Sequence, residues 1–589
     1  MTAERTPDSS RDPRYGSDVM ADAINSMGFR FAAINPGASY RGLHDSLVNY
    51  TDNSPELIQC LHEEIAVGIA HGYAKATGEP MAAIVHDVVG LLHASMSIYI
   101  AHMDRVPVVV FGGGGPMAVE KRRPEIDWLH SANVQGNAVR DYTKWDDQPA
   151  SVESVAQSVA RAYRAAVSQP QGPVYVAFDA ALQEEELHGP VSYPRFERLA
   201  PASRIGAEPA RLRELAALLV EARHPVAVCG YAGRDPSSFH ALVELSELLG
   251  MGVLDMHHRL NFPNRHPMSL GGADALAGAD LVFFVDVKDT ERATSRTDST
   301  TRESISLVPD GATVVGMGFG DLTLSAWTQD FAALTEMDLE VTADSSVALP
   351  ELVDLCRRLE AEQDPSRRDA RVRHRAEVEK AHDDEWSSWQ EQAESVWDQS
   401  PVSTARLAAE VWNVVQEYDW VLCPGTANEW AYRVWDFDKP YRHVGKTLGT
   451  GTQISISLGV ALAHKGSGRL VVDLQPDGDL LFDPQALWTA AYHEIPMLVV
   501  MFNNRAYYND WAHQERMARA RGRAVENAYL GMELDKPAPD FAAIARAFGW
   551  YAEGPVEHGD DVGAAVRRAA EVVAGTGQPA LVDVVCQPR

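Results

Sequence analysis

Short apolar runs alternate with helical stretches along the first third of the chain. Four of these runs are bounded by turn residues, and they span residues 29–37, 58–62, 80–87 and 106–111. Helical spacing fills the intervals, most clearly over 63–78, whose small side chains allow close packing, and over 89–104. Near-continuous apolar strands between helices are typical of parallel sheets covered on both faces. The pattern therefore predicts a doubly wound α/β unit.

The same alternation recurs twice more along the chain. Further apolar runs span residues 224–233, 279–287, 311–320, 419–425, 469–478, 495–504 and 579–587. Glycine turns follow the runs in the middle third, but they do not form GxGxxG, so they favour dinucleotide binding only weakly. We therefore predict an α/β fold made of three doubly wound parallel-sheet domains.

The predicted boundaries follow shifts in this pattern. The three domains span residues 17–195, 196–360 and 400–589, after a disordered lead-in over 1–16. Residues 361–399 are highly charged with helical spacing, which predicts a solvated helical linker. A chain of 589 residues accommodates this organisation, because domains average roughly 150 residues.

Composition and charge exclude several classes of function. The net charge of −31 argues against nucleic acid and anionic membrane surfaces as partners, because both need clustered Lys and Arg. No apolar run approaches the ~18–20 residues of a membrane span, and the N-terminus lacks the apolar core of a secretory signal. Five cysteines lie far apart without metal-ligand spacing: Cys60, Cys229, Cys356, Cys423 and Cys586. The sequence predicts a cytoplasmic protein with reduced, buried thiols.

Polar side chains end two consecutive strands of the last third. Asp477 follows one apolar run, and Asn504 ends the next. The carboxyl ends of neighbouring parallel strands lie on one rim of a sheet, where α/β proteins bind ligands. A carboxylate and an amide oxygen suit Mg²⁺. The helix predicted over 482–494 offers its N-terminus to phosphate. An ordinary acidic turn explains Asp477 alone, whereas the pair favours Mg²⁺ with a diphosphate.

The stretch from Asp477 to Asn504 resembles the thiamine diphosphate motif of the acetolactate synthase, pyruvate decarboxylase and benzoylformate decarboxylase superfamily. The resemblance covers the chain from about residue 17 to its end. It implies that Asp477 and Asn504 bind Mg²⁺ through side chains and Ala506 through its carbonyl. Gly478 and Asp479 would cradle the diphosphate. The other implied cofactor contacts are Gly425, Thr426, Ala427, Thr450 and Tyr507.

Three residues depart from the superfamily pattern. Pro476 replaces the usual first glycine and removes one N–H donor. Asp479 replaces a small residue, and an acid beside a diphosphate is repelled unless it points away or is protonated. Thr450 stands where the superfamily has a bulky apolar residue beneath the bent cofactor.

The N-terminal third resembles the superfamily in its Glu-containing segment, residues 60–78. There the resemblance assigns Glu63, rather than Glu64, to the carboxylate that hydrogen-bonds the cofactor's aminopyrimidine and favours its imino tautomer. Taken alone, Glu63 is equally an ordinary acid at a helix start. Its pairing with the C-terminal motif favours the activating role.

Several residues would line the substrate pocket or transfer protons. His86 aligns with the catalytic histidine of benzoylformate decarboxylase, and an imidazole transfers protons near neutral pH; a hydrogen-bonded core histidine is the alternative. Asp510 aligns with a proton-handling acid of pyruvate decarboxylase, although a solvated helix-start acid is as ordinary. The remaining pocket candidates, each with packing as its alternative, are Ala38, Ser39, His93, Gly114, His130 and Asn509.

The resemblance implies a thiamine diphosphate- and Mg²⁺-dependent 2-oxo acid decarboxylase or carboligase, similar to acetolactate synthase, that protonates an enamine or adds it to a carbonyl acceptor. A C–C lyase or hydrolase acting without decarboxylation is the first alternative, and a non-catalytic regulatory or assembly subunit is the second. The three domains would be pyrimidine-binding, central and diphosphate-binding. A homodimer or homotetramer with active sites at the subunit interface is implied, and structural FAD in the central domain stays open.

Overall fold

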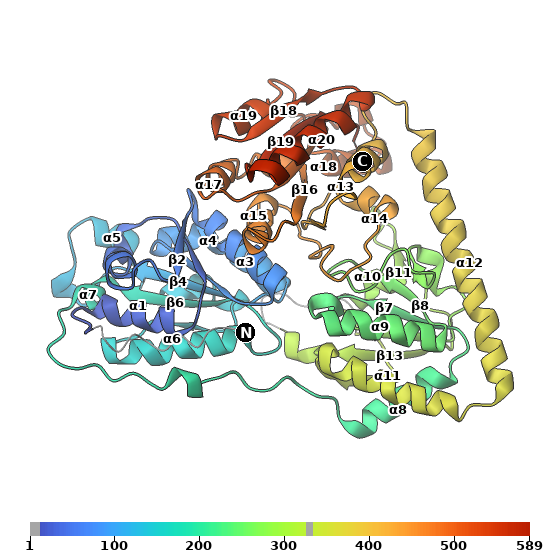
Figure 1. The fold of residues 1–589 in the computed structure, drawn as a ribbon, viewed down its shortest axis with the longest axis horizontal. Helices are drawn as coiled ribbons and strands as arrows, with labels where there is room; N and C mark the ends of the chain where they lie inside the picture. Colours follow the sequence, from blue (N-terminus) through green and yellow to red (C-terminus); the bar gives the residue numbers. More distant parts are fainter. Residues whose placement is uncertain (1–11, 325–333, 589) are drawn as a thin grey trace.

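The computed structural model describes residues 12–324 and 334–588, which form three parallel β-sheets joined by helices (Figure 1). All the named strand pairs within these three sheets are parallel, which confirms the predicted α/β fold class. Of the predicted lead-in over 1–16, residues 1–11 lie outside the described residues. The helix that follows it begins at Gly16.

The first sheet has the strand order β2-β1-β3-β4-β6-β5. Its strands are β1 (Phe31–Ile34), β2 (Glu56–Gln59), β3 (Met81–Val85), β4 (Val108–Gly114), β5 (Asp146–Asp147) and β6 (Val174–Asp179). Its helices are α1 (Gly16–Ser26), α2 (Arg41–Asp45), α3 (Glu63–Thr77), α4 (Val88–Met103), α5 (Ile126–His130), α6 (Val152–Val167) and α7 (Ala180–Glu184). The four strands β1, β3, β4 and β6 are buried throughout, because helices cover both faces.

The second sheet has the order β14-β13-β10-β7-β8-β9. Its strands are β7 (Pro225–Cys229), β8 (Gly252–Asp255), β9 (Ser269–Leu270), β10 (Leu281–Val285), β13 (Thr313–Gly318) and β14 (Leu339–Thr342). Its helices are α8 (Pro209–Glu221), α9 (Pro236–Leu249), α10 (Thr290–Thr294) and α11 (Ser345–Ala361). A separate antiparallel ribbon joins β11 (Ser295–Thr297) to β12 (Ser304–Ser306).

The third sheet has the order β15-β16-β17-β19-β18. Its strands are β15 (Trp420–Leu422), β16 (Leu470–Pro476), β17 (Leu498–Asn503), β18 (Tyr551–Val556) and β19 (Ala580–Val585). Its helices are α13 (Thr404–Val415), α14 (Glu429–Val434), α15 (Gln453–His464), α16 (Asp477–Leu480), α17 (Ala486–Tyr492), α18 (Tyr508–Ala520), α19 (Phe541–Ala547) and α20 (Gly559–Thr576).

Helices α3 and α15 join the first and third sheets into one packed unit (Figure 1). Glycines bring the two backbones together: a Cβ on Gly72 would lie 1.9 Å from the carbonyl oxygen of Ile456 and 3.0 Å from the Cα of Gly459. A single apolar core runs through this contact from one sheet to the other. The close packing expected from the small residues of 63–78 is therefore confirmed.

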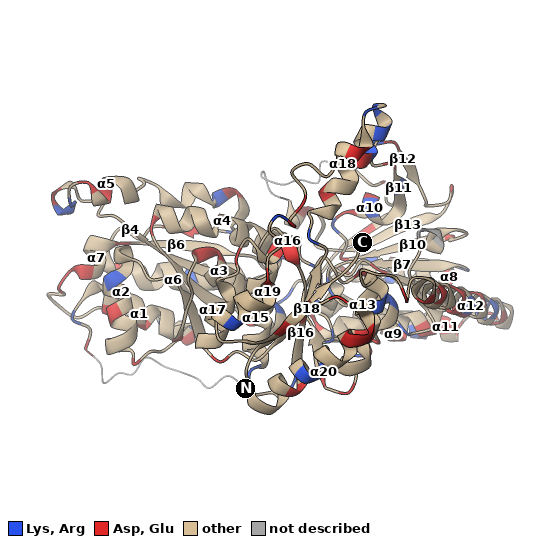
Figure 2. Ribbon diagram, turned by 90° about the horizontal axis from the view of Figure 1, so that it is seen from above, with Lys and Arg blue, Asp and Glu red and all other residues tan. Residues whose placement is uncertain are grey.

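The charged segment after the second sheet forms one long helix, α12 (Pro365–Ser395). It runs along the edge of the second and third sheets, and it carries charges of both signs (Figures 1 and 2). One side of the helix is nevertheless packed, with buried residues at His374, Val378, His382, Trp386 and Ala393. The segment is thus helical as expected, but it is not solvated all round.

Two expectations from composition concern the cysteines and membrane-spanning helices. All five cysteines are buried, as predicted. Within the described ranges, none of the helices combines the length and the apolar character that crossing a membrane requires.

Candidate active site

The third sheet places Asp477 and Asn504 on the same rim. Strand β16 ends at Pro476, which pairs with Phe502 of β17, so both strands finish side by side. Asp477 begins α16, and Asn504 directly follows β17. Pro476 is the N-cap residue of α16, a position whose N–H the helix does not need. The missing donor therefore leaves the turn intact.

Asp477 has the surroundings of a cation ligand. Its Oδ1 accepts a 2.7 Å hydrogen bond from the Gly478 N–H, while its buried Oδ2 has no hydrogen-bond partner among the described residues. Burial raises the pKa of Asp477 to about 6, although the backbone N–H groups of Gly478, Arg505 and Ala506 act to lower it. A divalent cation would satisfy the unpartnered oxygen and favour the carboxylate. The donor set therefore fits Mg²⁺.

Asn504 and the following loop complete that donor set. The Asn504 side-chain oxygen accepts a 3.0 Å hydrogen bond from the Ala506 N–H. Arg505, between them, has a left-handed φ of 56°, which is uncommon outside glycine and often marks functional loops. Tyr507 then packs its ring so closely on Gly478 that a Cβ there would lie 2.6 Å from Cε1.

Asp479 holds a glycine loop in place. Its Oδ1 accepts a 2.7 Å hydrogen bond from the Gly451 N–H, and its Oδ2 accepts a 3.1 Å bond from the Gln475 side chain. Burial raises the pKa of this carboxyl. The acid that departs from the superfamily pattern therefore positions the loop that contains Thr450.

That loop is strained at Thr450. Gly449, Thr450 and Gly451 all have left-handed φ angles, of 85°, 64° and 87°. A β-branched residue rarely adopts this region, and holding it there costs about 1–3 kcal/mol. The Thr450 hydroxyl donates to the Gly449 carbonyl oxygen, which offsets part of that cost.

Thr450→Gly should raise the free energy of unfolding by about 1 kcal/mol, because the strain outweighs the flexibility that glycine adds to the unfolded chain. Denaturant titration of the cofactor-free protein measures this change. Thr450→Val keeps the β-branch and should bring no gain. A glycine variant less stable than the wild type would show that the loop is not strained.

Two buried polar residues that sequence reasoning missed support the loop at 425–427. The Gln453 side chain donates to Asp473 Oδ1 at 2.7 Å and to the Leu474 carbonyl oxygen at 2.9 Å. Its own oxygen accepts a 3.3 Å hydrogen bond from the Thr426 N–H. Burial raises the pKa of Asp473 to about 7. The sequence signal that could have revealed Asp473 is an acidic residue inside the apolar run 469–478.

The first sheet contributes a cluster around Glu63. This residue begins α3 and is 4% exposed, and its Oε2 lies 3.2 Å from His93 Nδ1. Gly90 makes the cluster compact, since a Cβ there would lie 2.6 Å from Glu63 Oε1 and 2.7 Å from the Cβ of His86. The structure thus brings Glu63, His86 and His93 together.

His86 is held by further predicted pocket residues. Its Nδ1 lies 2.7 Å from the Ser39 hydroxyl, and its ring centroid is 5.4 Å from that of His130. A Cβ on Gly113 would lie 2.2 Å from Ser39 Oγ, so β4 needs a glycine there for Ser39 to fit. The Ser39 hydroxyl thus contacts His86, and its role in place of the hydroxyl that Ala38 lacks stays a prediction.

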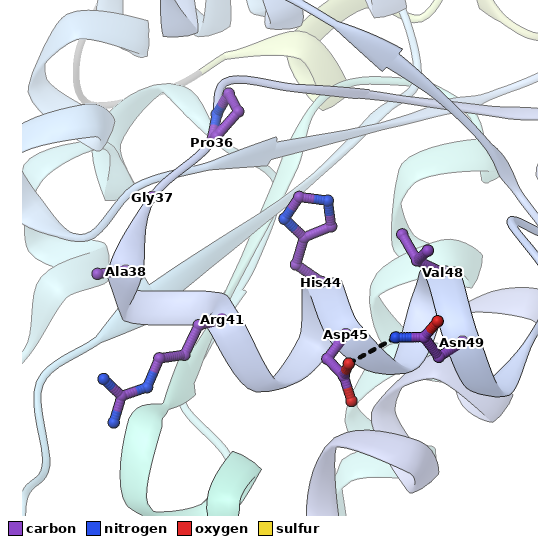
Figure 3. Close-up of a pocket in the computed structure, with 8 residues that line it drawn as sticks. All are labelled: Pro36, Gly37, Ala38, Arg41, His44, Asp45, Val48 and Asn49. Atoms are coloured by element: carbon purple, nitrogen blue, oxygen red, sulfur yellow. Dashed lines mark hydrogen bonds between the residues drawn. The ribbon is translucent and has the colours of Figure 1, made fainter.

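Ala38 lies on the outer side of the same loop. It lines a surface pocket of about 570 Å³ together with Arg41 and His44 (Figure 3). Gly114, at the end of β4, is buried, and a Cβ there would make ordinary contacts with Gln135 Oε1 and the Phe178 carbonyl oxygen, both at 3.8 Å.

Asn509 and Asp510 lie in the first turn of α18 with exposed side chains. No contact joins Asp510 to His86 within the part of the chain that the structure describes. The role of Asp510 in proton transfer stays a prediction.

Glu64 and Asp483 bring two acids together where α3 meets the third sheet. His62 lies beside them, with Nδ1 at 3.8 Å from Asp483 Oδ1. Burial, Asp483 and Asp479 raise the pKa of Glu64 to about 8, and burial with Asp479 raises that of Asp483 to about 6. Glu64 is therefore protonated at neutral pH in the folded chain.

The contribution of Glu64 to the stability of the cofactor-free protein should be lost as pH rises from about 5 to about 8. Glu64 keeps its proton in the folded state up to about pH 8 but releases it near 4.5 when unfolded. Folding therefore binds a proton in this window, and one proton contributes a slope of about 1.4 kcal/mol per pH unit. Glu64→Gln should remove this negative contribution from the slope of stability against pH, measured by denaturant titrations at several pH values. An unchanged slope would contradict the raised pKa.

The fold and the two groups of candidate residues define an α/β protein whose candidate site lies at the strand ends of its first and third sheets. Residues 14–136 match the model of the thiamine pyrophosphate enzyme N-terminal TPP binding domain, and residues 424–584 match that of the C-terminal TPP binding domain. The chain thus carries both TPP binding domains of thiamine pyrophosphate enzymes.

Individual relatives are distant but match along the whole chain. The acetolactate synthase isozyme 3 large subunit of Escherichia coli is 23% identical, covering 91% of this chain and 88% of that protein. Acetolactate synthase 1, chloroplastic, of Zea mays is also 23% identical, covering 98% and 86%. The crystal structure of benzoylformate decarboxylase from Polynucleobacter necessarius has a TM-score of 0.75 at 18% identity, covering 98% and 99%.

Proposed function

We propose that this chain is a thiamine diphosphate- and Mg²⁺-dependent 2-oxo acid decarboxylase or carboligase, similar to acetolactate synthase. The observation that carries the proposal is the buried, unpartnered oxygen of Asp477 beside Asn504, in a chain that also places Glu63 at a helix start. The bound cofactor supplies the electron sink for breaking the bond next to the carbonyl. The protein binds, orients and handles protons.

The third sheet would hold the cofactor's diphosphate end. Asp477 and Asn504 hold Mg²⁺ through side chains and Ala506 through its carbonyl, while Gly478 lets the phosphates approach. The loops at 425–427 and 449–451 flank this site, fixed by Gln453 and Asp479. Both supports are buried, so the loops are preorganised before the cofactor binds.

The first sheet would hold the pyrimidine end and the substrate. Glu63 accepts or shares a proton at a pyrimidine nitrogen, and its contact to His93 orients the carboxyl. His86 would transfer a proton to or from the substrate carbon or oxygen, with Ser39 fixing its ring. His130 lies behind His86 and extends the imidazole-lined surface.

The proposed assembly is a homodimer or homotetramer. In the superfamily the site forms between the first domain of one subunit and the third domain of another. In this arrangement the exposed Asp510 would face histidines of a partner's first domain. Small-molecule 2-oxo acids or carbonyl compounds are the proposed substrates.

A second candidate is C–C bond cleavage without decarboxylation. The glycine at position 114 favours it, because no side chain there anchors a small 2-oxo acid. Both candidates require the same cofactor, so the products separate them: release of CO₂ from a 2-oxo acid supports decarboxylation, and its absence with cleavage of a diketone or acyloin supports the alternative.

Calorimetric titration with thiamine diphosphate and Mg²⁺ tests the shared part of both proposals. The wild type should bind the cofactor only when the metal is present. Asp477→Asn should lose most of that binding, since it removes the charge next to the cation. Asp45→Asn, at an exposed carboxylate on α2, is the matched control. Equal binding by the wild type and the Asp477 variant would contradict the proposal.

A further inference from the structure

Three side chains outside the candidate active site converge between the second sheet and α12. His224 directly precedes β7, and His374 and Glu377 lie one turn apart on α12. His224 Nδ1 and His374 Nδ1 are 2.9 Å apart, and Glu377 Oε2 lies 3.7 Å from His374 Nδ1. One possible ligand atom from each of the three residues lies within 4.8 Å of the other two.

The two imidazoles are suited to bind a metal. Both direct the same type of ring nitrogen, Nδ1, at a shared point, where an ion could accept the lone pairs of both rings while a hydrogen bond uses only one of them.

The spacing matches a small divalent transition-metal ion. Two imidazoles at about 2.0 Å from a tetrahedral Zn²⁺ have nitrogens about 3.3 Å apart, close to the 2.9 Å found here. The Glu377 side chain is 70% exposed, so it can close on the ion and leaves an entry path from solvent.

A second layer of contacts fixes the loop that carries His224. Asp280 accepts hydrogen bonds from the backbone N–H groups of His224, at 2.8 Å, and Arg223, at 2.9 Å. Asp280 therefore fixes the backbone at His224 rather than its ring.

We propose that His224, His374 and Glu377 form a divalent transition-metal site, with Zn²⁺ as the best match, that joins α12 to the second sheet. Two imidazoles and one carboxylate supply three ligands, and water completes the tetrahedron. The site is independent of the proposed Mg²⁺ site, whose ligands are oxygens only. Its effect is to fix the long helix between the second and third sheets.

Zinc titration of the full-length, tag-free protein tests this proposal. The protein is first saturated with Mg²⁺ and thiamine diphosphate, and Zn²⁺ is then added in competition with a chromophoric chelator. The wild type should bind one more zinc ion per chain than His224→Ala or His374→Ala, or hold it at least tenfold more tightly. His240→Ala, at an exposed histidine on α9, should behave as the wild type.

Two further measurements keep the result clear if His374→Ala folds poorly. Glu377→Gln changes an exposed side chain and should still weaken zinc binding. Co²⁺ in the wild type should give the visible absorption of a tetrahedral site, and His224→Ala should lose it. Wild-type zinc binding in the His224 and Glu377 variants would overturn the proposal, as would loss of that binding in His93→Ala instead.

Discussion

Glu63→Gln should leave the fold intact and slow turnover of a 2-oxo acid by roughly 100-fold or more. Glutamine has the same shape, and it can still meet His93. It lacks the carboxylate that would share a proton with a pyrimidine nitrogen of the cofactor. Steady-state kinetics with saturating thiamine diphosphate and Mg²⁺ measure the loss, while calorimetry checks that the cofactor still binds.

The neighbouring acid provides a matched control for this experiment. Glu64 lies next in sequence but faces Asp483 rather than His93. Glu64→Gln should therefore retain most of the activity. Full activity in the Glu63 variant, or the larger loss in the Glu64 variant, would show that Glu63 does not have this role.

Gly72→Ala should destabilise the protein by about 3 kcal/mol or more, the upper range for overpacked positions. The added Cβ would lie 1.9 Å from the Ile456 carbonyl oxygen, which is backbone and cannot rotate away. Helices α3 and α15 must separate to relieve the clash, and the shared core between two sheets then loses packing. Denaturant titration gives the change in the free energy of unfolding.

A second helical glycine separates this clash from the usual effect of alanine. Gly575, near the end of α20, has open space around its Cβ position. Gly575→Ala should be neutral or stabilising, because alanine favours helix by about 1 kcal/mol. Similar stability changes in the two variants would mean that α3 and α15 do not pack as described.

The sequence was most informative where chemistry follows strand ends. Consecutive parallel strands must finish on one rim, so the order of residues along the chain was enough to predict Asp477 and Asn504 as neighbours. The alternation of apolar runs likewise predicted the three sheets, because buried parallel strands leave few other patterns.

Contacts between distant segments were not predictable in this way. The direction of Asp479 depends on a hydrogen bond to Gly451, and no local pattern encodes which way a buried carboxylate turns. His224 and His374 come from different elements, and only the tertiary fold brings them to 2.9 Å. The many charged residues of α12 predicted a fully solvated helix. Its five buried residues are too few to stand out in that charged sequence.

The uninterrupted course of α12 limits how this chain can vary in length. Its 31 residues form a rod about 46 Å long, at about 1.5 Å per residue. Inserting a single residue would turn everything beyond it by about 100°, so His382 and Trp386 would swing out to solvent. Only insertions close to a whole number of turns, such as about seven residues, would keep the buried side of α12 facing the sheets. The helix therefore sets a discrete spacing between the two sheets it connects.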